Sequence, residues 1–147
     1  MIPRPFLHGL RLAAAFTCLV LLHTSPRAAD DSLFADLGGR DGVEKIAQIA
    51  TTNFLADPRI KAQFDNTNMD RFEKLLSQQF CLVAGGPCAY KGRSMADAHK
   101  ALGLRDADFN AVVEDLEAAM DEANIPYRTQ TRFLARLAPM QHDVVTK

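Results

Sequence analysis

Apolar residues recur along most of this chain three or four positions apart, which is the spacing of one face of an α-helix. A helix is predicted over residues 41–55, and its inward face consists of Val43, Ile46, Ala47, Ala50 and Phe54. Another is predicted over residues 69–84, and its inward side consists of Phe72, Leu75, Leu76, either Gln79 or Phe80, and Val83. No alternating strand pattern persists, so we predict an all-α fold.

Polar residues, glycines and prolines mark the expected ends of these helices. A short opening helix over residues 32–37, capped by Asp31 or Ser32, should stop at the glycine pair 38–39. Pro58 ends the helix 41–55 and starts a short turn through residues 60–64. The polar run 65–68 then supplies a turn and a cap for the next helix.

The C-terminal half continues the helical pattern. Gly85, Gly86 and Pro87 stop the helix 69–84, and Ser94 caps a short helix over residues 95–101. A long helix starts at Asp106 and is broken by Asn124 and Pro126. The last helix is predicted as one run over residues 127–143. Its inward residues are Phe133, Leu134, Leu137 and Met140.

The N-terminus has the pattern of a secretory signal rather than of a folded element. Arg4 and Arg11 make a basic start, residues 12–22 form an apolar run, and Ala28-Ala29 offer a cleavage point. The run is shorter than the roughly 20 residues of a membrane span, although an uncleaved anchor stays open. We therefore predict a signal peptide over residues 1–29, one domain over residues 30–147, and export, most simply to the periplasm.

The predicted domain is mildly acidic, since removal of residues 1–29 takes away three arginines and no acid and leaves 14 basic against 18 acidic residues. This charge does not favour nucleic acid or, beyond the signal, a membrane surface. No phosphate-binding loop, nucleophile elbow or HExxH motif is present, so hydrolytic and nucleotide chemistry lack support.

Two cysteines remain in the predicted domain, Cys81 and Cys88, on either side of the glycine–proline turn. In an oxidising compartment they can close a disulfide, while two free half-buried thiols are the alternative. A CxxCH motif is absent, so covalent c-type haem attachment is unsupported. Together with His99 they would give three zinc ligands, but no matched spacing supports such a site.

His99 is the one histidine with an interesting position. It shares a helical face with Met95, Ala98 and Leu102, whereas His142 lies among polar residues near the C-terminus. A histidine on an apolar face is either simply packed there or serves as the axial ligand of an iron porphyrin, which needs one imidazole and an apolar slot. Nine phenylalanines and no tryptophan are compatible with such a slot.

Taken together, the motifs resemble the group I truncated haemoglobins, especially bacterial members with a cysteine pair around a Gly-Gly-Pro turn. The resemblance runs from about residue 33 to residue 145. Its marks are Leu37-Gly38-Gly39, Leu55-Ala56-Asp57-Pro58 with Phe64, Thr67-Asn68-Met69, Gly85-Gly86-Pro87 with Tyr90, Met95 with Ala98-His99, and the break at Pro126.

The resemblance implies a two-on-two helical sandwich around non-covalent haem b. By matching position, His99 becomes the proximal iron ligand and Phe64 the phenylalanine that stacks on the porphyrin. Met95 is expected to touch the proximal face. The helix 69–84 would turn three residues toward the distal side, namely Phe72, Leu76 and Phe80.

Two positions depart from the family. Thr51 stands where many members have a tyrosine, and Leu76 where many have a glutamine; these side chains donate hydrogen bonds to the bound gas. Losing a donor worth roughly 1.5–3 kcal/mol should speed oxygen release by on the order of 10- to 100-fold. We therefore expect a largely apolar distal pocket, in which Thr51 is either a weak donor or a packing residue.

The leading functional hypothesis is a protein that reversibly binds a diatomic gas, O₂, NO or CO, in the manner of an oxygen-binding or oxygen-transport globin. One alternative is a redox enzyme, such as an NO dioxygenase or a weak peroxidase, which would need an external reductase. Another is a haem-free helical sensor or scaffold. The sequence does not fix the oligomeric state.

Overall fold

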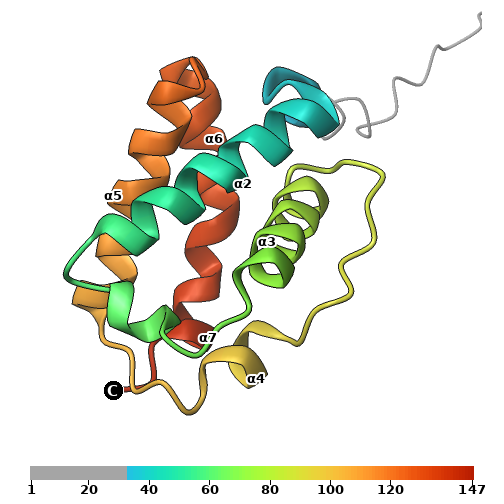
Figure 1. Ribbon diagram of the computed structural model, residues 1–147. Helices are drawn as coiled ribbons and strands as arrows, with labels where there is room; N and C mark the ends of the chain where they lie inside the picture. The colour runs from blue at the N-terminus through green and yellow to red at the C-terminus, as the bar shows by residue number, and fades with distance from the viewer. Residues whose placement is uncertain (1–32) are drawn as a thin grey trace, which may run out of the picture.

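The computed structural model of the protein describes residues 33–147, and all regular structure within that range is helical (Figure 1). The predicted signal segment and the predicted capping residues Asp31 and Ser32 lie outside the described residues. Within residues 33–147 no helix combines the length and apolar character needed to cross a membrane.

A short helical turn covers residues 33–36, and the longer elements follow in chain order. They are α2 (Gly39–Ala56), η1 (Lys61–Phe64), α3 (Met69–Val83), α4 (Met95–His99), α5 (Asp106–Glu122), α6 (Tyr127–Leu137), η2 (Ala138–Met140) and α7 (Gln141–Val144). The predicted all-α class is confirmed.

Two pairs of helices form the body of the molecule. Figure 1 shows α2 crossing in front of α5 and α6, with α3 beside it, and α2 packs on both α3 and α5. Helix α6 contacts α5 and α3. The short α4 packs against α7, the last helix of the chain. This arrangement is the two-on-two sandwich that the sequence predicted.

The buried core is centred on α2. Each of the five residues predicted to face inward from this helix is buried, which confirms that stripe. The core is completed by buried residues of α5, α6 and the C-terminal end of α3. Two of them, Phe80 and Phe133, meet edge to face with their ring centroids 5.2 Å apart.

Side-chain caps fix two helix starts where the sequence predicts them. The Asn68 side chain accepts a hydrogen bond from the backbone N–H of Arg71 at 2.9 Å at the start of α3. The Ser94 hydroxyl accepts one from the backbone N–H of Asp97 at 3.1 Å at the start of α4. Before Pro58, Asp57 is extended, as proline requires of the preceding residue, and α2 ends there.

Two predicted helices are shorter than expected. The single helix predicted over residues 127–143 is wrong, because the chain runs instead through α6, η2 and α7. Pro139 lies in η2, and a proline inside a helix removes a backbone donor and clashes with the preceding turn. Helix α4 ends at His99 rather than at residue 101, and Gly103 then turns the chain with a φ of 62°.

The corner between α2 and η1 is held by charged groups. Arg59 bonds the Asp57 carboxylate through its Nε at 2.8 Å and reaches Glu114 of α5 through Nη1 at 2.6 Å. These bonds from Arg59 hold the pKa of Asp57 below its ordinary value. Burial, reinforced by the negative charge of Asp57, raises the pKa of nearby Asp115. Its Oδ2 is buried without a hydrogen-bond partner.

The packing predicts that Phe133 is a major contributor to stability. Its side chain is 0% exposed, and replacing a buried phenylalanine by alanine typically costs about 3–5 kcal/mol because a cavity remains. Urea unfolding of Phe133→Ala should show a loss of this size, with Phe133→Leu losing less. Tyr127, which is 80% exposed, provides the control. A Tyr127→Ala loss equal to that of Phe133→Ala would contradict the packing.

Asp115 predicts an unusual pH dependence. Because its pKa is raised in the folded protein above the ordinary value of 3.8, its contribution to stability is greatest below that pH. It falls as the pH rises through the raised folded value. Asp115→Asn should therefore unfold at a higher temperature than the parent at neutral pH, and the difference should vanish in acid.

Asp57→Asn is a control for which the opposite change in stability is expected. Because the pKa of Asp57 is lowered in the folded protein, its carboxylate stabilises the fold above pH 3.8, and this stabilisation is lost in acid. This variant should be less stable than the parent at neutral pH. Melting curves between pH 3 and pH 7 that move both variants in the same direction would contradict the assignment.

Candidate functional site

His99 is the last residue of α4, and its imidazole is oriented by its own helix. Nδ1 lies 2.7 Å from the carbonyl oxygen of Met95, one turn earlier. Because a carbonyl oxygen can only accept, Nδ1 carries the proton in this pair. The neutral ring then has its lone pair on Nε2, the arrangement that protein histidines adopt when they bind a metal.

Helix α4 is positioned by contacts with neighbouring segments, since it contributes no side chain to the buried core. None of its five residues is buried, although Met95, Ala98 and His99 are half-buried. It packs on α7, and the chain just after it is tied to the C-terminus. The Leu104 N–H donates to the Thr146 hydroxyl at 3.2 Å, and the Leu104 carbonyl accepts from the N–H of Thr146 at 2.9 Å.

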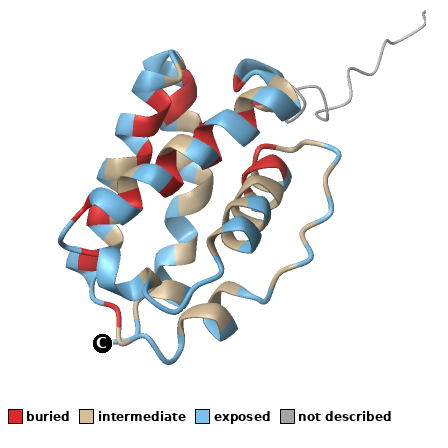
Figure 2. Cartoon of the chain, in the orientation of Figure 1, coloured by how far each residue is buried: buried red, intermediate tan, exposed pale blue. Residues whose placement is uncertain are grey.

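Apolar side chains that are only half-buried lie on α3, α6 and η1 as well as on the helix α4 that carries His99. Figure 2 shows this intermediate class along α3, α4 and the lower part of α6, whereas the buried class is concentrated on α2 and the far end of α5. The half-buried apolar residues of these elements, of η1 and of η2 include Phe64, Phe72, Leu75, Leu76, Met95, Leu134, Leu137 and Met140. The protein alone leaves this apolar surface incompletely covered.

Phe64 is the link between this half-buried set and the core. Its ring stacks on the buried Phe54 with the centroids 5.9 Å apart and the planes 5° from parallel. Phe72 approaches the same ring edge-on, at 5.3 Å and 69°. Two aromatic neighbours therefore fix the orientation of Phe64, while part of its side chain stays open.

The predicted distal residues do not all share one environment. Phe72 and Leu76 are half-buried on α3, as expected of residues beside a ligand. Phe80 is only 4% exposed and packs on Phe133, so it belongs to the core cluster. Thr51 is 5% exposed, and its hydroxyl has no hydrogen-bond partner.

Two glutamines on α3 have roles that the sequence did not indicate. Gln79 is half-buried, and its side-chain amide contacts the sulfur of Met140 at 3.3 Å, across the half-buried apolar set. Gln78 accepts a hydrogen bond from the backbone N–H of Lys91 at 3.3 Å. The helical spacing left either Gln79 or Phe80 on the inward face, and the structure buries Phe80 while Gln79 stays half-buried.

Cys81 and Cys88 form a disulfide, so of the two states that the sequence left open the structure has the bonded one. It ties the end of α3 to the segment leading to α4. Among residues 33–147, histidine, cysteine, aspartate and glutamate side chains form no group of three or more that could hold a metal ion.

A family model described as bacterial-like globin matches residues 32–146. The chain belongs to the bacterial-like globin family. This globin is 35% identical over 94 residues to a group 1 truncated haemoglobin of Tetrahymena thermophila, covering 64% of this chain and 78% of the relative. It is 28% identical over 120 residues to one of Mycolicibacterium paratuberculosis, covering 82% and 88%.

Solved structures give the same assignment. The truncated haemoglobin of Tetrahymena pyriformis in its Fe(III) form matches this globin with a TM-score of 0.76 and 29% identity, covering 78% of this chain and 98% of that one. A 2/2 haemoglobin of Synechococcus with covalently attached haem matches with a TM-score of 0.72 and 26% identity, over the same shares. The sequence, the fold and the relatives thus agree on a truncated globin.

Proposed function

We propose that this globin holds haem b non-covalently, with Nε2 of His99 as its iron ligand, and reversibly binds a diatomic gas. The observation that carries the proposal is the contact between Nδ1 of His99 and the Met95 carbonyl. It directs the unprotonated nitrogen of the ring away from its own helix. Ferrous haem would supply an iron at which O₂, NO or CO binds and leaves.

The remaining residues fit a flat apolar group. The half-buried apolar side chains of α3, α6 and η2 include leucine, phenylalanine and methionine, the kind that line cofactor sites. Phe64, braced by Phe54 and Phe72, would lie against the porphyrin. Covering these residues would bury apolar surface that now meets water, which is favourable. The short α4, which packs on α7 but buries no residue of its own, would then gain a second packing partner.

Non-covalent attachment is favoured by the sequence, which has no CxxCH motif. The covalently attached haem of the Synechococcus structure is a property of that protein. Of the two histidines in residues 33–147, His142 is exposed on α7. His99 is the half-buried one, and we propose it for the iron.

Around the gas we propose a largely apolar pocket with Thr51 as its one hydroxyl. Phe72 and Leu76 offer no hydrogen-bond donor, and the Thr51 hydroxyl is buried without a partner. A buried hydroxyl that lacks a partner costs free energy, so it is available to donate to a polar ligand. Peroxidase chemistry favours an acid–base group beside the iron, which these three residues do not provide.

We also propose export, most simply to the periplasm. The proposal rests on the basic and apolar pattern of residues 1–29. The Cys81–Cys88 disulfide supports it, because disulfides persist in oxidising compartments and are rare in the cytosol.

His99→Ala tests the iron ligand. The purified protein should bind one hemin per chain with a sharp Soret band, and His99→Ala should bind it more weakly. The affinity for hemin should fall by more than the roughly 10- to 100-fold that follows removal of a residue that only hydrogen-bonds to a metal ligand. Added imidazole should restore the band. The control is His142→Ala, which should bind hemin like the parent; equal binding by His99→Ala would refute the proposal.

Thr51 has two informative replacements. Thr51→Val removes the unpartnered hydroxyl, so the haem-free protein should gain on the order of 1 kcal/mol in urea unfolding. Thr51→Tyr supplies a stronger donor and should slow oxygen release by on the order of 10- to 100-fold in stopped-flow measurements. An oxygen release rate that is the same in the parent, the valine and the tyrosine variants would show that position 51 does not reach the gas.

A further inference from the structure

The segment between α3 and α4, residues 85–94, contains no helix and leads directly into the helix that carries His99. Figure 1 shows it swinging away from α3 before it returns to α4. Two bonds attach it to α3 through side chains, namely the Cys81–Cys88 disulfide and the hydrogen bond from the Lys91 N–H to Gln78. At the end of the helix, the backbone N–H groups of Gly85 and Gly86 also donate to the Leu82 and Cys81 carbonyls. Its other hydrogen bonds that involve a side chain are local. The Tyr90 hydroxyl donates to the Arg93 carbonyl at 2.9 Å, and the Arg93 and Ser94 side chains bond to Asp97 in the first turn of α4.

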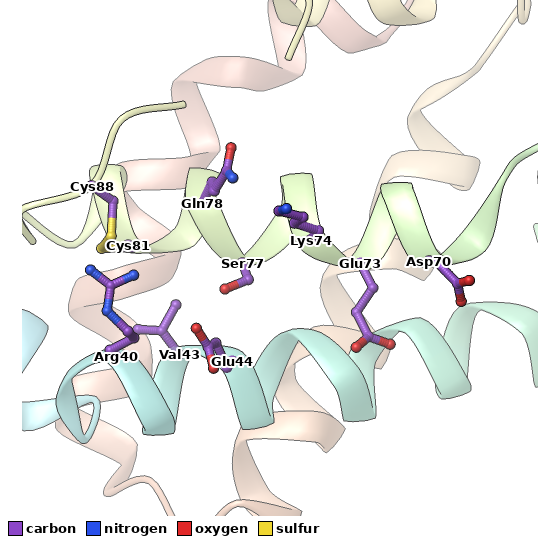
Figure 3. A pocket seen from close by; sticks show the side chains of 10 residues that line it. All are labelled: Arg40, Val43, Glu44, Asp70, Glu73, Lys74, Ser77, Gln78, Cys81 and Cys88. Carbon is purple, nitrogen blue, oxygen red and sulfur yellow. A yellow bond between two sulfur atoms is a disulfide. The ribbon is translucent and has the colours of Figure 1, made fainter. Parts of the chain in front are cut away.

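The disulfide borders a groove between α2 and α3. Ten residues line this groove of about 320 Å³, both cysteines among them (Figure 3). Cys81 is 2% exposed and Cys88 is half-buried, so Cys88 is the cysteine that an external thiolate reaches more easily. The Arg40 guanidinium lines the same groove and points toward Cys81 in Figure 3. A cation there stabilises a thiolate that leaves from Cys81.

We propose that the Cys81–Cys88 disulfide is a redox-sensitive tether of the His99 helix, opened through this groove by an external dithiol. Opening it would loosen the attachment of residues 87–94 to α3 and weaken haem retention. The effect on haem rests on the proposed function, whereas the release of the segment does not.

The exchange needs only a dithiol as reductant. A donor thiolate attacks Sγ of Cys88, forming a mixed disulfide and releasing Cys81 as a thiolate, which takes up a proton. The second donor thiolate attacks the donor sulfur of the mixed disulfide, and Cys88 leaves as a thiolate that is protonated by water. The donor ends as a disulfide, and two electrons have passed to the two cysteines.

After reduction, the single bond between Gln78 and Lys91 is left to attach the segment to α3 through a side chain. A neutral hydrogen bond of this kind contributes little to stability. Helix α4 has no buried residue to hold it, while the Leu104–Thr146 bonds still restrain its far end. The N-terminal end of α4 is therefore the part that gains freedom.

Hydrogen exchange tests the tether without haem. The third cysteine of the sequence, Cys18, belongs to the predicted signal and is replaced by serine so that only Cys81 and Cys88 can react. The full chain with Cys18→Ser is compared in its oxidised form and after reduction with dithiothreitol, which is then removed by anaerobic gel filtration. Mass spectrometry should count two free thiols. Deuterium uptake should rise in peptides covering residues 85–99 and stay unchanged in α2, which also shows that the fold persists.

Haem transfer from the same two forms to excess apomyoglobin tests the consequence. Haem should leave the reduced form about tenfold faster than the oxidised form, a change that corresponds to about 1.4 kcal/mol. Cys81→Ser/Cys88→Ser in the same background should match the reduced form and should not respond to dithiothreitol. This variant shows that the response belongs to this disulfide; if it does not fold, the reduced parent still provides the measurement.

Three results would overturn the tether. The disulfide could resist dithiothreitol in the native protein while it reacts in urea, the reduced form could exchange deuterium like the oxidised form, or haem loss could be equal in both. A protein that binds no hemin in either form would instead refute the proposed function, and hydrogen exchange would still decide whether the disulfide restrains residues 85–99.

Discussion

The packing of the apolar stripe of α2 against α3 and α5 is the interaction on which the rest of the structure depends. The buried side of α2 supplies a large part of the core, and Phe80 and Phe133 close it from α3 and α6. Helices α4 and α7 bury no residue, so they add nothing to this core and are positioned relative to it. The molecule thus combines a closed core with an apolar half that its own side chains cover incompletely.

This division explains how a small domain can offer a site for a large flat group. The buried core is packed without the group and keeps α3, α5 and α6 in place, while the half-buried residues of these helices remain available to the group. The imidazole of His99 is oriented by one hydrogen bond within α4. The position of α4 itself depends on short restraints at both ends, the disulfide before it and the Leu104–Thr146 bonds after it.

Much of the fold follows from local sequence signals. Asn68 and Ser94 cap helices where predicted, Pro58 closes α2, and the stripe on α2 is buried throughout, because each feature is decided within a few residues. Pro139 is an equally local signal for a break. The prediction of one helix over residues 127–143 gave more weight to the apolar spacing of Phe133, Leu134 and Leu137. The missed break shows that a continuous inward face does not require a continuous helix.

The site could be predicted less completely, because its properties depend on partners far away in the chain. The sequence places His99 one turn after Met95, but only the folded helix shows that Nδ1 is the ring nitrogen paired with the Met95 carbonyl. The environments of Phe80 and Thr51 depend on tertiary packing: Phe80 meets Phe133, and the Thr51 hydroxyl meets no partner. The cysteine spacing permits a disulfide without requiring one, so both states remained open until the structure showed the bond.

A crystal structure of the protein reconstituted with hemin tests the central claim most directly. The proposal predicts Nε2 of His99 in the coordination sphere of the iron, Nδ1 still paired with the Met95 carbonyl, and the porphyrin against Phe64 and Phe72. An iron bound by His142 or by no protein nitrogen, or a haem lying outside the half-buried apolar residues, would contradict it.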